Sequence, residues 1–399
     1  MDALKKITVI GDVMCEPPLL AQAKQPNGSY DFLPVFAPLK GLLSEADYVI
    51  ANLETPLAGE AAGYADSMSS FNTPDAIAEA LKAIGVDAVS TANNHCTDRG
   101  LEGIRRTNET LDRIGIVHTG TYADPETADR ILYVTVGNTK LALIAYTTSN
   151  NRKVELDAQG EKQVNMLRPS HGNKSCVPKP QVLLDMQKFI QEDLGRKLSW
   201  IENIRLKRAL GVPVAYADDL IEEEKWAPYV RRMEAEIRAA KKQADVVCFL
   251  PHTGGQFNVE PGKASVYFVS RAVEAGADAV LASHAHTVQR AELRGSVPCF
   301  YSLGNVTMWP NSDYVEHSTL PEYGLAAHLY VSGGKIQKTA FSVFKMVQSE
   351  TEPLTVVPVD ELYAQLVGEA KAQLLSDVQQ IVLRVAGRAD AQICREYPL

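Results

Sequence analysis

The sequence has few cysteines, no hydrophobic run long enough to cross a membrane and no recognisable leader. Its six cysteines include no CxxC pair, which argues against a disulfide framework and predicts reduced thiols. The longest apolar runs, such as 141–146 and 246–250, are strand-sized and far below the ~18 residues that span a bilayer. Lys5 and Lys6 precede only a short apolar segment, too short for a signal-peptide core. We therefore expect a cytoplasmic protein without a membrane anchor.

An excess of basic residues is also missing. Lys and Arg number 40 against 49 Asp and Glu, so the net charge is −9. Binding to nucleic acid through phosphate contacts requires a basic surface, and we expect no nucleic-acid partner. With 45% hydrophobic and 22% charged residues, the composition is that of an ordinary globular protein. From the length of 399 residues we expect about two domains of ~150 residues each.

The chain alternates short β-rich segments with helical ones, which predicts an α/β layered fold with a mixed sheet. Two hairpins are expected, one around Gly137-Asn138 and one with 324–331 and 335–344 flanking Gly333-Gly334. The other predicted strands are 7–10, 48–51, 88–91, 246–250, 279–282 and 298–302, and the predicted helices between them are 75–84, 101–114 and 265–275.

Residues 151–244 interrupt this alternation. They contain 18 Lys and Arg against 14 Asp and Glu, and they look mostly helical over 181–194, 199–210 and 219–242. They form either a separate helical insertion or lid over the site, or ordinary solvated helices. Apolar residues in 360–385 recur at the spacing of one amphipathic packing helix. The predicted organisation is a core in two parts, 1–150 and 245–347, with the insertion 151–244 between them and a C-terminal packing region, 348–399.

Five short polar clusters follow predicted strands directly, and this repeated placement is the informative feature of the sequence. Ligands of open α/β sheets gather outside the carboxyl ends of strands. Each cluster alone is weak, because Asp and Asn are common in turns, but the ordered set points to one site. The clusters are Gly11-Asp12-Val13-Met14, Asn52-Leu53-Glu54, Asn93-Asn94-His95 with Asp98, Pro251-His252-Thr253-Gly254 and Ser283-His284-Ala285-His286.

These side chains are suited to binding transition metals. Carboxylates give hard oxygen ligands, and histidines give nitrogen ligands that suit Mn, Fe, Zn or Ni. His284 and His286 are two residues apart, so an extended segment would point both rings to one side. Two metal ions ~3.5–4 Å apart clamp a phosphoryl group and generate hydroxide at neutral pH. The candidate metal ligands are Asp12, Glu54, Asn94, His252, His284 and His286.

His95 and Asp98 are the candidate catalytic pair. His95 follows a candidate ligand, and Asp98 lies three residues later, where it could orient the imidazole as a general acid or base. Arg99 could hold an anionic group of the substrate, or be solvated on a helix surface. Asn305 could touch the substrate or support the loop of His252. Together with Asn52, these two are the candidate substrate-binding residues.

The order of motifs, GDVM, NLE, ANNHxxDxG, HxG, HxHxVQ and YSLGN, resembles the CapA/PgsA family of poly-γ-glutamate capsule-synthesis proteins. This family is part of the calcineurin-like metallophosphoesterase superfamily, and the resemblance covers residues 7–305 apart from 151–244. It implies a four-layer α/β/β/α sandwich carrying a dinuclear metal centre, with His95 protonating the leaving oxygen. It also implies one metal on Asp12, Glu54 and His286, and another on Glu54, Asn94, His252 and His284.

The sequence departs from the superfamily pattern at several positions. Met14 stands where the first superfamily motif has a histidine, so one metal site could lack a ligand and the protein could hold one metal instead of two. Glu54 must take the place of a bridging aspartate. Gln256 stands where the family pattern expects glutamate, which removes a negative charge near the pocket.

Three functions are compatible with these residues. The first is a metal-dependent hydrolase, attacking an anionic small molecule that is most simply a phosphoester, through a metal-activated hydroxide. The second is amide transfer or hydrolysis on γ-linked glutamates in poly-γ-glutamate metabolism. The third is a non-catalytic binding component of a polymer-synthesis complex. The substrate, the metal and the oligomeric state do not follow from the sequence.

Overall fold

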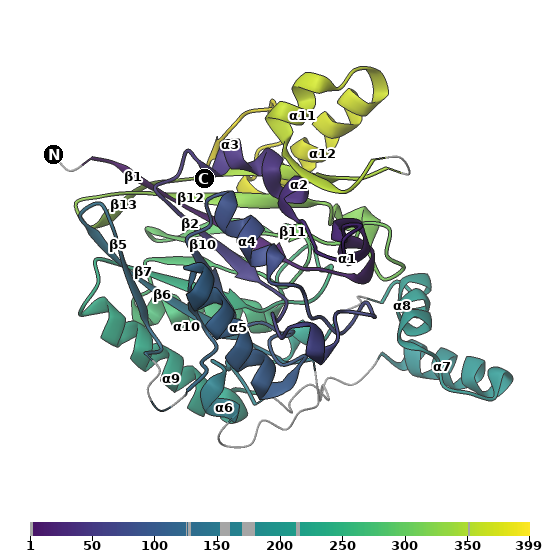
Figure 1. The fold of residues 1–399 in the computed structure, drawn as a ribbon. Coiled ribbons are helices and arrows are strands. Elements are labelled where there is room, and N and C mark those ends of the chain that lie inside the picture. Colours follow the sequence, from purple (N-terminus) through teal and green to yellow (C-terminus); the bar gives the residue numbers. More distant parts are fainter. Residues whose placement is uncertain are drawn as a thin grey trace.

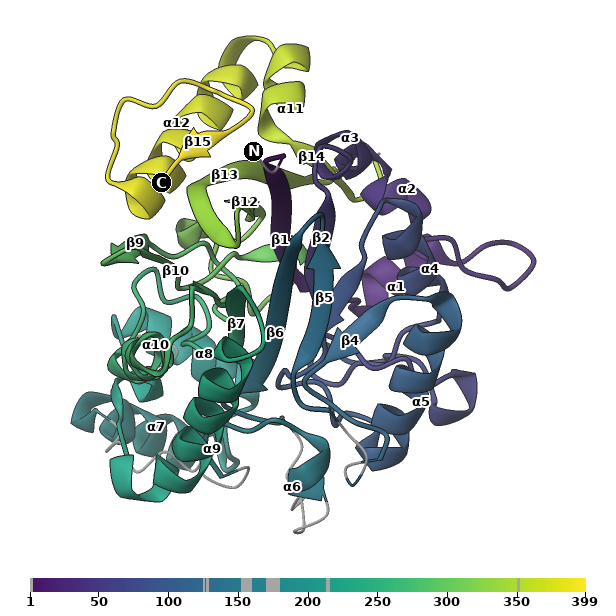
Figure 2. The same cartoon turned by 90° about the vertical axis from the view of Figure 1, so that its left-hand side faces the viewer.

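A computed structural model describes residues 3–124, 126, 129–151, 160–169, 180–212, 216–349 and 352–399. Two β-sheets pack face to face, and helices cover the outer face of each sheet (Figures 1 and 2). This is the four-layer α/β/β/α sandwich that the resemblance implied, and the prediction of fold class is confirmed.

The first sheet has the strand order β14-β13-β12-β1-β2-β3-β4, with β11 beside β1 and β15 beside β13. Strands β1 to β4 are parallel, while β12 runs antiparallel to β1. The strands are β1 (Lys5–Val13), β2 (Tyr48–Leu53), β3 (Ala88–Ser90), β4 (Val117–Thr119), β11 (Asn305–Thr307), β12 (Tyr323–Ser332), β13 (Lys335–Val347), β14 (Thr355–Pro358) and β15 (Tyr397–Pro398).

The second sheet has the order β5-β6-β7-β8-β10-β9. Strands β6, β7, β8 and β10 are parallel, and β5 and β9 form antiparallel edges. The strands are β5 (Leu132–Val136), β6 (Thr139–Thr147), β7 (Val246–His252), β8 (Ala279–Leu281), β9 (Ala291–Arg294) and β10 (Val297–Phe300).

Both predicted hairpins are confirmed. Strands β5 and β6 pair across a turn in which Gly137 has φ +60°. Strands β12 and β13 pair across Gly333 and Gly334, whose φ values are +57° and +69°. Two successive positive φ values define the turn that matches the twist of a two-residue hairpin, and glycine adopts them at low cost.

The core lies in three apolar layers. Between the sheets, Val9 and Ile50 of the first sheet pack with Leu143 and Cys248 of the second.

The outer face of the first sheet is covered by α1 (Pro17–Ala23), α2 (Leu33–Phe36), α3 (Lys40–Leu43), α4 (Ala76–Ala83) and α5 (Gly100–Ile114), and that of the second by α9 (Glu223–Lys241) and α10 (Lys263–Ala275). The remaining helices are α6 (Gly160–Gln163), α7 (Gln181–Leu194), α8 (Trp200–Ala209), α11 (Val359–Gln365) and α12 (Gly368–Ala386), with short 3₁₀ turns at Ala37–Leu39, Glu60–Ala62, Tyr216–Asp219 and His317–Thr319.

The structure differs from the expected insertion at its C-terminal boundary. Helix α9 lies inside 151–244, yet its buried face, including Trp226, Met233 and Ile237, packs on the second sheet. This helix is therefore part of the outer layer of the sandwich. Helices α7 and α8 form a hairpin that projects from the body of the molecule (Figure 1). Residues 152–159, 170–179 and 213–215 lie outside the described part of the chain.

The C-terminal region contains two helices where one was predicted. The chain breaks at Leu366 and Val367, both extended, and resumes at Gly368 with φ +59°. The apolar stripe continues across the break, because Leu362 on α11 and Leu374 and Val378 on α12 belong to the same hydrophobic cluster as the residues between the sheets. The apolar periodicity predicted the buried face of this region but not the break. The break falls at Val367, whose side chain is 82% exposed and lies outside the apolar stripe.

Strand β1 approaches the start of β11 very closely. A Cβ atom on Gly11 would lie 1.9 Å from the carbonyl oxygen of Gly304, and the next backbone amide, that of Asp12, donates to the same oxygen at 3.0 Å. Only glycine fits at position 11, and the contact fixes the end of β1 against the loop before β11.

Replacing Gly11 by alanine should therefore push β1 away from Gly304. We expect Gly11→Ala to lower the free energy of unfolding by about 2–3 kcal/mol, as is typical of overpacking, measured by urea denaturation. Gly41→Ala is the matched control, because its Cβ would meet nothing closer than 3.6 Å. Equal stability of the two variants would contradict the close approach.

Candidate metal centre

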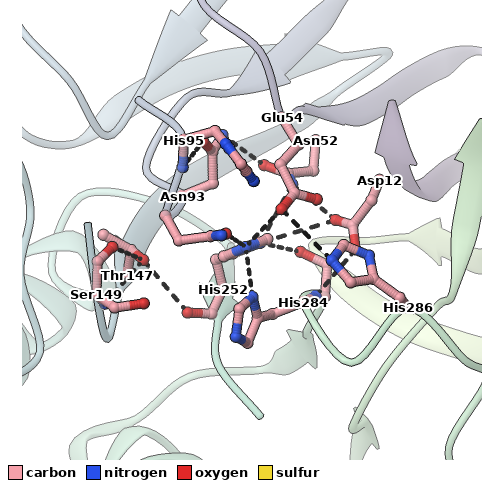
Figure 3. A network of polar contacts seen from close by, with 12 residues as sticks. Asp12, Asn52, Glu54, Asn93, His95, Thr147, Ser149, His252, His284 and His286 are labelled. Carbon is pink, nitrogen blue, oxygen red and sulfur yellow. Dashed lines mark hydrogen bonds and ion pairs between the residues drawn. The ribbon is translucent and has the colours of Figure 1, made fainter. Parts of the chain in front are cut away.

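The five polar clusters converge at one edge of the sandwich (Figure 3). Asp12 lies at the end of β1, Glu54 just after β2, and Asn94 and His95 in the loop after β3. From the second sheet, His252 ends β7, while His284 and His286 follow β8. The parallel strands of both sheets thus end at the same place, and residues from five separate loops meet there.

Asp12 is fixed by its neighbours on both sides. Its register partners are Asn52 on β2 and Asn305 on β11. The Asn52 side chain donates to Asp12 Oδ1 at 2.7 Å, and the backbone amide of His284 donates to Oδ2 at 3.0 Å. The carboxylate is fully buried, and these two donors hold it in position.

One group of ligand atoms surrounds Nε2 of His252. Asn94 Oδ1 lies 2.6 Å from this nitrogen, His284 Nδ1 lies 3.0 Å away, and Glu54 Oε1 lies 3.3 Å away. A neutral imidazole nitrogen carries at most one proton, so it cannot donate to all three of these atoms. Such a convergence of oxygen and nitrogen ligands is what a divalent transition metal requires.

A second group consists of Asp12, Glu54 and His286. His286 Nε2 lies 3.8 Å from Glu54 Oε1, and His286 Nδ1 lies 3.7 Å from Asp12 Oδ2. The Nδ1 side of the ring also contacts Asn305 Oδ1 at 2.9 Å. The ligand atoms of this group, like those of Glu54, His252 and His284, all lie within 4.8 Å of one another. Glu54 is the residue that the two groups share.

Both carboxylate oxygens of Glu54 are buried and have no hydrogen-bond partner. Burial and the neighbouring Asp12 carboxylate raise the pKa of Glu54 to about 8. A buried carboxylate without donors is expensive unless it is protonated or paired with a cation. The residues therefore fit a metal ion on either side of Glu54.

Two histidines of the centre, His252 and His284, favour their neutral forms. Burial lowers the pKa of His252 to about 4, against the opposing effect of Asp12. Burial and the nearby histidines lower the pKa of His284 well below its usual range. Neutral imidazole is the form that binds metal, so these residues are prepared as ligands at neutral pH.

The backbone at His284 and His286 is not extended as expected. Their φ values are +105° and +53°, in a region that residues other than glycine rarely adopt. Residue 285 between them is a buried alanine whose carbonyl accepts the backbone amide of Phe257 at 2.7 Å. Both rings therefore reach the centre from a loop with positive φ at each histidine, and not from an extended segment. Backbone strain of this kind is concentrated at functional sites.

His95 and Asp98 form a buried pair beside the ligands. His95 Nδ1 lies 2.6 Å from Asp98 Oδ2, which also accepts the backbone amide of Phe71 at 2.6 Å. The imidazole stacks on the Phe71 ring with the centroids 4.0 Å apart. Nδ1 therefore donates to Asp98, and Nε2 on the other side of the ring lies 3.0 Å from the Asn151 amide.

A cavity of about 400 Å³ lies beside His95 of this pair and beside one candidate ligand, His286. His95 and His286 line it, and so does Met14, two residues after Asp12. Its thioether is a soft, weak ligand, so the group of Asp12, Glu54 and His286 has fewer strong donors than the group around His252.

The three candidate substrate-binding residues hold loops in place. Asn52 accepts from Ser90 Oγ at 2.7 Å while donating to Asp12. Asn305 bridges His286 and the carbonyl of Pro321. The Arg99 guanidinium donates to the carbonyls of Ala62 and Gly63 and to Ser70. Asn305 thus contacts the loop of His286 and not, as one of its two predicted roles required, that of His252.

Two residues at the site were not identified from the sequence. Asn151 lies shortly after the end of β6, where the same strand-end rule would have found it. Phe71 gave no signal, because an aromatic residue between predicted elements is most simply a core residue.

Comparisons with known proteins agree with the arrangement. The model of the family "Bacterial capsule synthesis protein PGA_cap" matches residues 6–308. The chain belongs to this family.

Curated relatives of this PGA_cap chain include an uncharacterised protein of Sinorhizobium fredii, 27% identical over 75% of this chain and 65% of its own length. The capsule biosynthesis protein CapA of Bacillus anthracis is 21% identical over 80% of this chain and 63% of its own length. The chain thus spans slightly less than two thirds of the curated relatives that it matches. A solved structure of a hypothetical protein from Thermus thermophilus is 17% identical, covers 88% of this chain and 97% of its own, and has a TM-score of 0.38.

None of the helices in the described part of this PGA_cap chain is both long enough and apolar enough to cross a membrane.

Removing one ligand from each group should separate the two sites. We expect about two divalent ions per chain in the wild type and about one in each of His252→Ala and His286→Ala, measured by elemental analysis after loading with Mn²⁺ or Zn²⁺. His118→Ala is the matched control, since that ring contacts Asp112 away from the centre. Wild-type protein that binds no metal under these conditions would contradict the assignment.

The buried carboxylate gives the metal-free protein a distinctive pH dependence. The folded-state pKa of Glu54, about 8, exceeds its ordinary value of 4.5. Between these values the folded state holds a proton that the unfolded state has lost, so this group makes stability fall as pH rises. We expect Glu54→Gln to raise the free energy of unfolding of metal-free protein at pH 8.5 by about 1–4 kcal/mol.

The same substitution should have little effect at pH 4.5, where Glu54 is protonated in the folded state. Chemical denaturation of the wild type and Glu54→Gln at both pH values checks this. A stabilisation that is the same at both pH values would show that ionisation of Glu54 is not its cause.

Proposed function

We propose that this chain is a metal-dependent hydrolase that acts on the phosphoester of an anionic small molecule. The observation that carries the proposal is the Glu54 carboxylate, which is buried without donors and shared by two groups of ligand residues. When bound, two divalent ions supply charge neutralisation for a phosphoryl group and lower the pKa of water. Mn²⁺, Fe²⁺, Zn²⁺ and Ni²⁺ all suit this mixture of oxygen and nitrogen ligands.

The chain contributes a positioned proton donor. Asp98 accepts from His95 Nδ1, which fixes the ring and leaves Nε2 facing the Asn151 amide and the cavity. A protonated Nε2 can deliver its proton to the leaving oxygen of a phosphoester whose phosphoryl group lies at the ligands. The Phe71 ring and the backbone amide of Phe71 hold the pair in this orientation.

The remaining residues of the site keep the ligands in register. Asn52 and the His284 amide hold Asp12, and Asn305 holds His286. His95 is 4% and His286 2% exposed, so bulk water is excluded from most of the centre. Exclusion of water strengthens each electrostatic contact that forms there.

Replacing the proton donor should lower turnover without removing metal. We expect His95→Gln to reduce kcat on an alkyl phosphate by about 10²–10⁴-fold, the range of general acid catalysis, with metal content unchanged. Asp98→Asn should give a smaller loss, because the ring is still present but less well oriented. Steady-state kinetics and elemental analysis on the same preparations measure both. A His95→Gln variant as active as the wild type would rule out the assigned role.

A second candidate function follows from the family. A Bacillus subtilis relative, 20% identical, is named a PGA biosynthesis protein, which favours amide transfer or hydrolysis on γ-linked glutamates. Turnover of γ-glutamyl peptides, with none of alkyl or aryl phosphates, would favour this alternative. Metal-dependent binding of an anionic polymer that survives His95→Gln, without turnover of either class, would favour a binding component of a polymer-synthesis complex.

A further inference from the structure

The loop that carries His286 is held from outside. His286 belongs with Asp12 and Glu54 to the second group of candidate ligands, and its backbone has φ +53°. A residue other than glycine keeps such a conformation only where its surroundings impose it. Asn305 supplies one restraint, because its side chain contacts His286 Nδ1 at 2.9 Å and donates to the His286 carbonyl at 3.0 Å.

A second restraint reaches the same loop from the C-terminal helix. Helix α12 contacts β9 at the edge of the second sheet (Figure 2), and Arg384 lies in its last turn. Arg384 Nη1 donates to the carbonyl oxygen of Val288 at 2.9 Å and to Thr287 Oγ1 at 3.2 Å. Thr287 and Val288 are the two residues that follow His286. Helix α12 is therefore bonded to the chain directly after a candidate ligand.

The same guanidinium joins this loop to a third part of the chain. Arg384 Nη1 also donates to the carbonyl oxygen of Thr319 at 2.9 Å, and Thr287 Oγ1 donates to that oxygen at 2.7 Å. The next residue, Leu320, has φ +60°, so a second segment with positive φ lies at the contact. Arg384 thus connects α12, the loop of His286 and the segment at Leu320.

The chemistry of this contact suits an arginine. The three acceptors are two backbone carbonyls and one hydroxyl, and a guanidinium offers several donors and no acceptor. Hydrogen bonds from a charged donor are stronger than those between neutral groups. A cation in the last turn of a helix is also favourable for the helix itself, so a test must separate this general effect from the contact with the loop.

We propose that Arg384 is a positioning residue of the candidate metal centre, which holds the loop of His286 in the orientation that this ligand needs. The inference rests on the metal-dependent function proposed above, through the role of His286 as a ligand. Arg384 contributes no ligand atom and acts through the residues after His286. The support of the centre thereby extends to α12, which lies beyond residues 6–308 that the family model matches.

The test measures the effect of Arg384→Met on each group of ligands separately. His252→Ala leaves the group of Asp12, Glu54 and His286, and His286→Ala leaves the group around His252. Titration calorimetry of the metal-free full-length chain with Mn²⁺ gives Kd in each background. In His252→Ala, we expect Arg384→Met to raise Kd about tenfold, the lower end of the range for groups that orient a metal ligand.

In the His286→Ala background the same substitution should change Kd by less than about twofold, because the group around His252 does not depend on this loop. A general loss of structure would weaken both groups alike. An equal increase of Kd in the two backgrounds, or no increase in either, would therefore overturn the inference.

Arg388→Met is the matched control. Arg388 follows the end of the same helix, and its guanidinium donates to the carbonyl of Pro398. Its removal takes the same charge from the same helix end, so Kd should stay unchanged in both backgrounds. An increase as large as that of Arg384→Met would show that charge at the helix end, and not the contact with the loop, is the cause.

Thr287→Val gives a second, milder test. It nearly keeps the shape of the side chain and removes the hydroxyl that contacts both Arg384 and Thr319. We expect Kd to rise about threefold in the His252→Ala background only, since outer contacts of a ligand loop have graded effects. If Arg384→Met does not fold, this variant decides the question, and an unchanged Kd would overturn the inference.

Turnover of an alkyl phosphate by the wild type separates the inference from the function beneath it. If Arg384→Met weakens only the group of His286 and the wild type hydrolyses no phosphoester, Arg384 is a positioning residue and the proposed hydrolase activity is wrong. If the wild type hydrolyses the ester and Arg384→Met leaves Kd unchanged, the function stands and the inference is wrong. If His252→Ala binds no Mn²⁺, the group of His286 is not a metal site and the inference is wrong.

Discussion

The buried carboxylate of Glu54 is the constraint around which this structure is organised. Two carboxylates, Asp12 and Glu54, lie together at the meeting point of the two sheets, and both are fully buried. Asp12 is stabilised by an amide side chain and a backbone amide, whereas Glu54 has no donor. A folded chain tolerates such an arrangement only if the site is completed by protons or by cations. Glu54 is therefore the residue that makes this centre a candidate site for divalent cations.

The sandwich makes this convergence possible because both sheets end their parallel strands at the same edge. Neighbouring strands β1, β2 and β3 deliver Asp12, Glu54 and Asn94 from one sheet, and neighbouring strands β7 and β8 deliver the three histidines from the other. The geometry is then held by very close backbone contacts, of which Gly11 against Gly304 is the tightest. That contact seats β11 beside β1, and β11 begins with Asn305, which holds His286. Stability of the fold and position of the ligands therefore depend on the same contacts.

Local patterns in the sequence could predict an α/β layered fold and the place of the candidate ligands, whereas the four-layer arrangement was implied by the family resemblance. Short β-rich segments identify buried strands, and in a parallel sheet the residues after each strand necessarily share one edge. The same rule could not predict how His284 and His286 reach the centre, since their positive φ values are imposed by the buried Ala285 loop and not by the residues themselves. It also could not assign α9 to the sandwich, because a helix that covers a sheet and a helix in an insertion can have the same apolar spacing. Only the contacts of Trp226 and Met233 with the second sheet distinguish them.

Residues that surround the centre divide into those that hold it and those that face the cavity, and this division bears on specificity. Asn52, Arg99 and Asn305 have the polar side chains expected of substrate contacts, yet they bond to the backbone and to ligand residues. The cavity is lined by Met68, Asn151, Gln256 and Tyr314 together with His95 and the candidate ligand His286. Membership of the family and the convergence of these side chains therefore identify a candidate metal centre more closely than they identify a reaction.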